Sequence, residues 1–282
     1  MTEALRLEAV DLSAGYDQRQ ILSGVSLSLM PGRITSIVGG NASGKSTLLR
    51  TLARVLSPKG GRVLLDGKSI HARRSREVAK SVGLLPQSPI APEGITVRDL
   101  VARGRHPHQG MFATRNAKDA QAVCEALRLT GTANLAEREV DTLSGGQRQR
   151  AWIAMALAQE TGLLLLDEPT TFLDVAHQID VLDLLVDLNR TRGTTIVMVL
   201  HDLNLAARYS DRLVAIAAGG IQSEGDPRDV LTEANVRTVF GLESRIVTDP
   251  VSGAPSMVPI GRHRCENLGK QNGHISDKIN QL

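Results

Sequence analysis

Aromatic residues are scarce in this chain of 282 residues, which contains two tyrosines, three phenylalanines and one tryptophan. Proteins that bind single-stranded nucleic acid stack the bases on aromatic side chains, so the scarcity argues against that function. The net charge of +3 is also too small for a protein that wraps DNA. We therefore expect no nucleic-acid partner, and the slight positive charge suits anionic ligands or an anionic membrane surface.

Long apolar runs are missing as well. The longest, 163–166 and 196–200, have the size of strands, whereas a membrane-spanning helix needs about 18 apolar residues or more. The first residues carry acidic side chains and lack the order of a secretory signal, a basic segment followed by an apolar one. The two cysteines, Cys124 and Cys265, are too few for a disulfide framework and have no metal-ligand spacing, which favours a reducing cytosol.

Predicted strands and helices alternate along most of the chain, which indicates an α/β fold with a mostly parallel sheet flanked by helices. Near residues 5–9 and 25–29, apolar and polar residues alternate, and this pattern predicts an N-terminal antiparallel β portion. Between about 89 and 141 the pattern turns helical and predicts an inserted subdomain. The expected division is an α/β core (1–88 and 160–262), a helical subdomain (89–159) and a disordered tail (263–282) that lacks apolar periodicity.

The strongest motif is G-x-x-x-x-G-K-[ST], which lies between a predicted strand and a predicted helix. Its glycines let the backbone turn tightly, so that N–H groups point at phosphate oxygens, and the helix start adds a positive dipole end. We expect Lys45 to reach the β- and γ-phosphates, Ser46 to offer its hydroxyl to Mg²⁺ and Thr47 to bond the α-phosphate. The loop consists of Gly39, Gly40, Asn41, Ala42, Ser43, Gly44, Lys45, Ser46 and Thr47.

Two carboxylates, Asp167 and Glu168, follow the run of four leucines at 163–166. Such a run is typical of a strand buried in a parallel sheet, and ligands bind at the carboxyl end of such strands. With a phosphate loop in the same chain, Asp167 is expected to hold Mg²⁺ through water and Glu168 to polarise the attacking water. By itself, an apolar strand that ends in two acids is common and need have no such role.

The segment Leu143–Gln147 predicts a second anion site, at the start of a helix. Ser144 is a good N-cap, and Gly145 and Gly146 expose backbone N–H groups in the first turn, followed by Gln147. The phosphate loop already surrounds one side of a nucleotide. Two such sites in one chain therefore suggest two chains, each of which closes the other's nucleotide. The alternative is an ordinary capped helix.

The set GGNASGKST, LSGGQ, LLLLDEPT and a later LHD resembles the ATP-binding subunits of ABC transporters, in order and spacing, over about residues 4–262. The resemblance implies ATP and Mg²⁺ as cofactors and a head-to-tail homodimer with two ATP molecules between phosphate loop and LSGGQ. Two positions depart from the family pattern: Gly40 stands where proline is usual and Ala42 where glycine is common.

The resemblance also implies roles for four further residues. Tyr16 would stack on adenine, and Asp174 would lie in the loop that crosses the dimer interface. Gln87 would contact Mg²⁺ and the attacking water, and His201 would contact the γ-phosphate. The other histidines have no ligand spacing, and we expect solvated or packed roles for them; they are His71, His106, His108, His177, His263 and His274.

Within the family, the absence of a membrane span favours an importer subunit that works with a separate permease. The stretch VARGRHPH at 101–108, with LLDEPTTFLD and VLHDLN, resembles the ATPases of ferric-siderophore importers of the enterobactin type. This implies integral membrane permease subunits, an indirect periplasmic or extracellular binding protein, and a peripheral position on the cytoplasmic face of the inner membrane. Other cargo, such as vitamin B12, haem or a metal, is an alternative. An ABC ATPase that acts on DNA or ribosomes is a more distant one, because it usually carries long coiled coils or duplicated cassettes.

Overall fold

The computed structural model describes residues 5–110, 117–171 and 173–261. Its central sheet has the strand order β10-β9-β3-β8-β7-β6, and every neighbouring pair is parallel except β10 and β9. The strands are β3 (Ile34–Gly39), β6 (Val82–Leu85), β7 (Leu163–Asp167), β8 (Thr195–Val199), β9 (Arg212–Ala217) and β10 (Gly220–Gly225). This sheet confirms the predicted α/β fold.

A second, antiparallel sheet is built from the N-terminal strands in the order β2-β1-β4-β5. Its strands are β1 (Leu7–Tyr16), β2 (Arg19–Ser28), β4 (Gly60–Leu65) and β5 (Lys68–Ser69). On β1 the buried side chains alternate with less buried ones at first, as expected for a strand with one face on the core. The predicted N-terminal β portion is therefore present and antiparallel.

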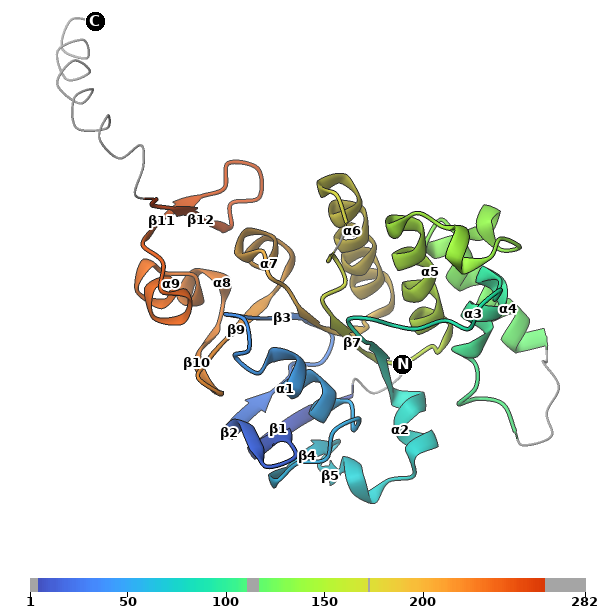
Figure 1. Cartoon of the computed structure of the whole chain (residues 1–282), viewed down its shortest axis with the longest axis horizontal. Helices are drawn as coiled ribbons and strands as arrows, with labels where there is room; N and C mark the ends of the chain where they lie inside the picture. Colours follow the sequence, from blue (N-terminus) through green and yellow to red (C-terminus); the bar gives the residue numbers. More distant parts are fainter. Residues whose placement is uncertain (1–4, 111–116, 172, 262–282) are drawn as a thin grey trace, which may run out of the picture.

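The central sheet divides the apolar interior into two cores. Leu164 and Leu166 of β7 face the layer that contains α5, α6 and α7, whereas Leu163 and Leu165 face α1 and the N-terminal sheet. Figure 1 shows the same layers, with α5–α7 above the sheet and α1 with β1, β2 and β4 below it. Both faces of β7 are buried, which explains its unbroken run of leucines.

Helices α3, α4 and α5 gather at one end of the molecule (Figure 1). The guanidinium of the buried Arg105, just after α3, joins these helices. Its Nε donates to Asp119 in α4 over 2.9 Å. Its Nη1 donates to Ala158 O and to Glu160 at the end of α5, both over 2.7 Å. The helices of the chain are α1 (Lys45–Leu52), α2 (Ser75–Ser81), α3 (Val97–Arg103), α4 (Ala117–Leu129), α5 (Gly145–Ala158), α6 (Val175–Arg192), α7 (Leu203–Tyr209), α8 (Pro227–Val230) and α9 (Glu233–Phe240). The helical region thus appears where the sequence indicates it, and the division into domains stays a prediction.

Beyond β9 the chain adds elements that the sequence pattern did not indicate. They are β10, helices α8 and α9, and an antiparallel hairpin of β11 (Ser244–Thr248) and β12 (Pro255–Pro259). The hairpin packs beside α7, where Asn204 bonds the backbone of Met257 through both its Nδ2 and its Oδ1. The predicted tail, 263–282, lies outside the described residues.

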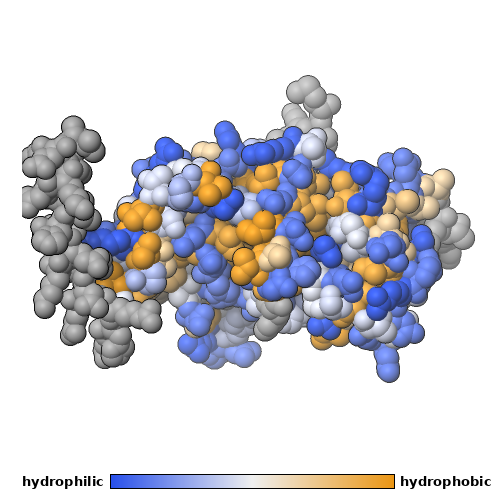
Figure 2. All heavy atoms as spheres, turned by 90° about the horizontal axis from the view of Figure 1, so that it is seen from above, coloured by the Kyte–Doolittle hydropathy of each residue, from blue (hydrophilic) through white to orange (hydrophobic). Residues whose placement is uncertain are grey.

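The face that is uppermost in Figure 1 carries apolar and hydrophilic residues interspersed with one another (Figure 2). Within the described part of the chain, no helix combines the length and the apolar character that crossing a membrane requires.

Candidate functional site

The phosphate loop connects the end of β3 to the start of α1. Gly44 caps α1 with a φ of 110°, and Lys45 is the first residue of the helix. The Lys45 ammonium donates to the carbonyl oxygens of Gly39 (2.9 Å) and Gly40 (2.8 Å), so the lysine closes the loop on itself. Burial lowers the pKa of Lys45, while the nearby carboxylates of Glu168 and Asp167 act in the opposite direction.

The glycines of the loop are not equivalent. A Cβ on Gly39 would lie 2.2 Å from the carbonyl oxygen of Ile216, and one on Gly44 would lie 2.5 Å from Leu22 Cδ2. A Cβ on Gly40 would meet nothing closer than 3.7 Å, which is an ordinary contact. Ala42 has a φ of 59°, in the left-handed region that an L-residue enters at a cost. The structure therefore leaves room for a side chain at position 40 and would suit glycine at position 42.

Asp167 is the last residue of β7 and lies next to the loop. Its Oδ1 accepts a hydrogen bond from Ser46 Oγ over 2.9 Å. Its Oδ2 is buried without a partner in the described part of the chain, and so is Ser43 Oγ in the loop. Burial raises the pKa of Asp167, although the Ser46 bond and the charge of Arg50 oppose the increase. A carboxylate oxygen and a hydroxyl in these positions fit a hydrated Mg²⁺ and a phosphate group respectively.

Glu168 is held by three side chains at the end of β7. His201 Nε2 lies 2.6 Å from Oε1, while Gln87 Nε2 and Thr171 Oγ1 donate to Oε2 over 2.8 and 3.0 Å. Its φ of 56° is left-handed, a strained conformation of a kind that concentrates at functional sites. Burial would raise the pKa of Glu168, but the hydrogen bonds from His201, Thr171 and Gln87 outweigh it and lower the pKa. The carboxylate is thus kept ionised and oriented.

Most of these groups line one cavity of about 360 Å³, whereas Gly39, Gly40 and Asp167 lie behind its lining. Tyr16 stands at its mouth, 41% exposed, and its hydroxyl accepts a bond from Arg50 Nη1 over 3.1 Å. The predicted residues that line the cavity come from β1, the phosphate loop, the segment after β6 and the ends of β7 and β8; they are Tyr16, Asn41, Ala42, Ser43, Gly44, Lys45, Ser46, Thr47, Gln87, Glu168 and His201. The fold thus gathers residues that are far apart in the sequence.

The LSGGQ residues do not line this cavity. Ser144 caps α5 and forms a capping box with Gln147: its Oγ accepts from Gln147 N over 3.3 Å, and its own N donates to Gln147 Oε1 over 3.2 Å. Asp174, which also lies outside the cavity, caps α6 by accepting from His177 N over 2.9 Å. The structure therefore separates the predicted residues into two groups on one chain.

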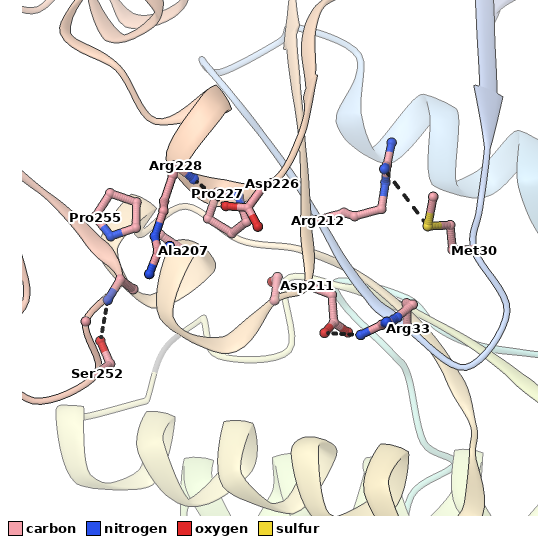
Figure 3. Close-up of a pocket in the computed structure, with 13 residues that line it drawn as sticks. Met30, Arg33, Ala207, Asp211, Arg212, Asp226, Pro227, Arg228, Ser252 and Pro255 are labelled. Atoms are coloured by element: carbon pink, nitrogen blue, oxygen red, sulfur yellow. Dashed lines mark hydrogen bonds and ion pairs between the residues drawn. The ribbon is translucent and has the colours of Figure 1, made fainter.

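Another cavity, of about 550 Å³, lies near the amino-terminal ends of β3 and β9 (Figure 3). It contains none of the predicted site residues. Arg33 at its edge is paired with Asp211 over 3.1 Å, and Arg228 donates its backbone N–H to Asp226. Its lining thus mixes arginines with aspartates, and none of the described residues that form it belongs to the phosphate loop.

Sequence reasoning missed several residues of the first cavity. Arg19 and Ile21 of β2 line it. Beside it, Thr171 donates a hydrogen bond to Glu168, and Arg50 donates one to Tyr16. Thr171 follows the two carboxylates closely, which is a signal that could have found it. The Ser-x-x-Gln spacing within LSGGQ is a known signature of the capping box. Nothing in the local sequence indicates that Arg19 reaches the cavity.

Comparisons with known proteins identify the family of this chain. A family model described as ABC transporter matches residues 22–171. The ferric enterobactin transport ATP-binding protein FepC of Escherichia coli (strain K12) is 49% identical over 263 residues, which are 93% of this chain and 97% of that protein.

Two solved structures are also similar. An inward-facing ABC transporter of the metal-chelate type matches with a TM-score of 0.79 and 32% identity, over 92% of this chain and 98% of that one. The ATP-binding cassette MJ0796, a dimer in a post-hydrolysis state bound to ADP and Pi, matches with a TM-score of 0.69 and 28% identity, over 78% of this chain and 98% of that one.

Proposed function

The chain belongs to the ABC transporter family, as an ATP-binding subunit that hydrolyses ATP in step with transport, and from that premise we propose that its system imports ferric siderophores. The observation that supports this cargo is the similarity to the ferric enterobactin protein, which extends over 93% of this chain. Similarity to a metal-chelate type transporter points the same way. The ATPase itself does not touch the cargo, which a permease and a binding protein would handle.

We propose that the cavity of about 360 Å³ binds Mg²⁺-ATP. Ser46 Oγ and Asp167 Oδ2, which has no partner among the described residues, would hold the ion and its water, and the ion would neutralise charge on the phosphates. Lys45 would exchange its bonds to the Gly39 and Gly40 carbonyls for the β- and γ-phosphate oxygens. Tyr16 presents its ring at the mouth of the cavity, where it would cover the base.

In this proposal Glu168 is the general base for the attacking water. Its Oε2 is fixed by Gln87 and Thr171, and its Oε1 by His201, so the carboxylate enters the reaction already oriented. His201 would release Oε1 when it turns to the γ-phosphate. That exchange would free one oxygen of Glu168 for the proton of the water only when a nucleotide is in place.

We propose further that the active form is a head-to-tail homodimer. The helix starts at Ser144 and Asp174 lie outside the cavity of their own chain, so a second chain must supply these groups to a bound nucleotide. The similar cassette that is a dimer bound to ADP and Pi supports this arrangement. Integral permease subunits would hold the pair at the cytoplasmic face of the membrane, and Gln87, at the carboxyl end of β6, would link the nucleotide to the permease.

Uptake assays in a strain that lacks this gene test the cargo. We expect the strain to lose uptake of radiolabelled iron supplied as a siderophore complex but to keep uptake of vitamin B12 and haem. The wild-type gene should restore the uptake, and a Lys45→Ala gene expressed at the same level should not. Loss of vitamin B12 or haem uptake with normal siderophore uptake would contradict the proposed cargo. Co-purification with a membrane permease tests whether the chain assembles with permease subunits.

A further inference from the structure

The N-termini of α5 and α6 lie side by side and are built alike. In each helix the third residue reaches back to the cap: Gln147 bonds the backbone of Ser144 in α5, and His177 Nδ1 lies 2.7 Å from Asp174 Oδ1 in α6. The Asp174 carboxylate can only accept, so His177 Nδ1 carries the proton of this bond. The hydrogen bonds from the His177 backbone and ring lower the pKa of Asp174, which keeps the carboxylate ionised.

The ring of His177 also covers Gly146 of the LSGGQ segment. A Cβ built on Gly146 would lie 2.9 Å from His177 Cδ2 and 3.1 Å from Cγ, so the ring occupies the space that a side chain at position 146 would need. One turn further along, Arg150 Nη1 lies 3.8 Å from Asp180 Oδ2 in a looser link between the same helices. His177 therefore contacts both helix starts that lie outside the cavity.

We propose that His177 is a positioning residue for hydrolysis at the partner's ATP. Its ring fixes Gly146, and its Nδ1–H fixes Asp174, so that the two helix N-termini meet the partner's nucleotide as one rigid unit. The proposal rests on the homodimer proposed above, and it replaces the solvated or packed role that the sequence suggests for this histidine. The His177 and Asp174 side chains are 39% and 67% exposed, so the surrounding protein does little else to hold them.

The role of the His177 side chain can be tested by substitution without removing the N-cap of α6. Asp174 caps α6 through the N–H of residue 177, which every substitution except proline retains. Three variants separate the two contacts: His177→Asn keeps a donor near Asp174 without the ring, His177→Phe keeps a ring over Gly146 without the donor, and His177→Ala keeps neither. Asp180→Ala is the matched control, because it removes the other link between α5 and α6.

We expect His177→Ala to lower kcat for ATP hydrolysis by about 10- to 100-fold, because misplacing a catalytic group by an ångström can cost that much. KM for ATP should stay within about twofold of the wild-type value, since the nucleotide is bound by the other chain's phosphate loop. The Asn and Phe variants should each recover part of the loss, and Asp180→Ala should match the wild type. An unchanged kcat in His177→Ala would overturn the proposal, and so would an equal loss in Asp180→Ala, since that indicates only helix packing.

ATP-dependent dimerisation gives a second measurement. In a Glu168→Gln background at saturating ATP and Mg²⁺, His177→Ala should need a higher protein concentration to reach half-maximal dimer in gel filtration. If this background dimerises and His177→Ala does not change the midpoint, the positioning role is wrong and the homodimer stands. If the Glu168→Gln chain binds ATP but stays monomeric, the homodimer is wrong and the role of His177 fails with it.

Discussion

The two groups of site residues differ in how completely one chain builds them. Around the phosphate loop, Lys45, Ser46 and Glu168 each bond to residues in or beside the same cavity, and two buried oxygens have no partner among the described residues. At the starts of α5 and α6, Ser144 and Asp174 are exposed, and their side chains accept hydrogen bonds from Gln147 N and His177 N in the first turns of their own helices. The first group is a buried, largely preformed pocket. The second is an exposed surface whose cap residues bond within their own helix starts.

This difference indicates where nucleotide binding and hydrolysis are controlled. A preformed pocket allows one chain to bind ATP alone, because little conformational entropy is lost when its side chains are already in place. The exposed caps lie outside this pocket and would not contact a nucleotide bound by their own chain. In the homodimer proposed above, hydrolysis would therefore depend on a second chain, and the protein would bind ATP without consuming it until two chains meet.

Glu168→Gln should produce the largest effect, a loss of hydrolysis of about 10²- to 10⁴-fold, because the amide keeps the size of the side chain and removes the base. ATP binding should remain, and gel filtration with ATP and Mg²⁺ should show a species of twice the monomer mass. A variant that turns over normally and stays monomeric would contradict the assignment.

Lys45→Ala should lower the rate of ATP hydrolysis by about 10²- to 10³-fold, because Lys45 supplies a fixed positive charge to the phosphates.

Ser144→Arg should also block hydrolysis, but the same chain should still bind a fluorescent ATP analogue. A mixture of the two variants should regain part of the activity, because one of the two composite sites then combines an intact phosphate loop with an intact LSGGQ. Loss of nucleotide binding in the Ser144→Arg monomer would show that the two groups belong to one pocket.

Gly39→Ala and Gly40→Ala form a matched pair in the preformed pocket. The first places a Cβ 2.2 Å from the Ile216 oxygen and should lower the free energy of unfolding by about 1–3 kcal/mol. The second finds 3.7 Å of space and should change it by about 0.5 kcal/mol or less. Thermal unfolding without nucleotide measures both, and equal losses would mean that the loop is not held against β9.

Ala42→Gly should have the smallest effect. Relief of the left-handed strain is worth about 1–2 kcal/mol, and the extra freedom of glycine in the unfolded chain returns about 0.5–1 kcal/mol of it. We therefore expect a net stabilisation of about 1 kcal/mol or less in denaturant unfolding. A clear destabilisation would show that the Ala42 methyl packs usefully in the loop.

Much of the preformed pocket could be predicted from the sequence because each part carries a local signal. The spacing of Gly39, Gly44 and Lys45 indicates the loop, and the four leucines before Asp167 indicate a strand whose carboxyl end meets it. The left-handed φ of Glu168 could not be predicted from its residue type, and neither could its contacts with Gln87 and His201, which come from distant segments. The approach of His177 to Gly146 depends in the same way on how α6 packs against α5.

The C-terminal elements escaped prediction for a different reason. β10 has no fully buried position, since its residues range only from partly buried to exposed, and in β12 the partly buried and exposed residues form two blocks between prolines at both ends. Prolines at strand ends weaken a strand signal, because such a residue cannot donate to the ladder. The bonds from Asn204 that place the hairpin bring together residues more than fifty positions apart, which no local pattern shows.

The run of leucines in β7 has a consequence for the accuracy of folding. All four side chains are buried, and successive ones enter different cores, so sliding the strand by one residue would exchange one apolar environment for another. Hydrophobicity alone therefore gives this strand no unique alignment. The slide is opposed at the end of the run, where it would drag the carboxyl groups of Asp167 and Glu168 into the apolar interior of the sheet. The two acids proposed to act in hydrolysis would thus also fix the alignment of the strand, and replacing them with apolar residues would permit misaligned chains.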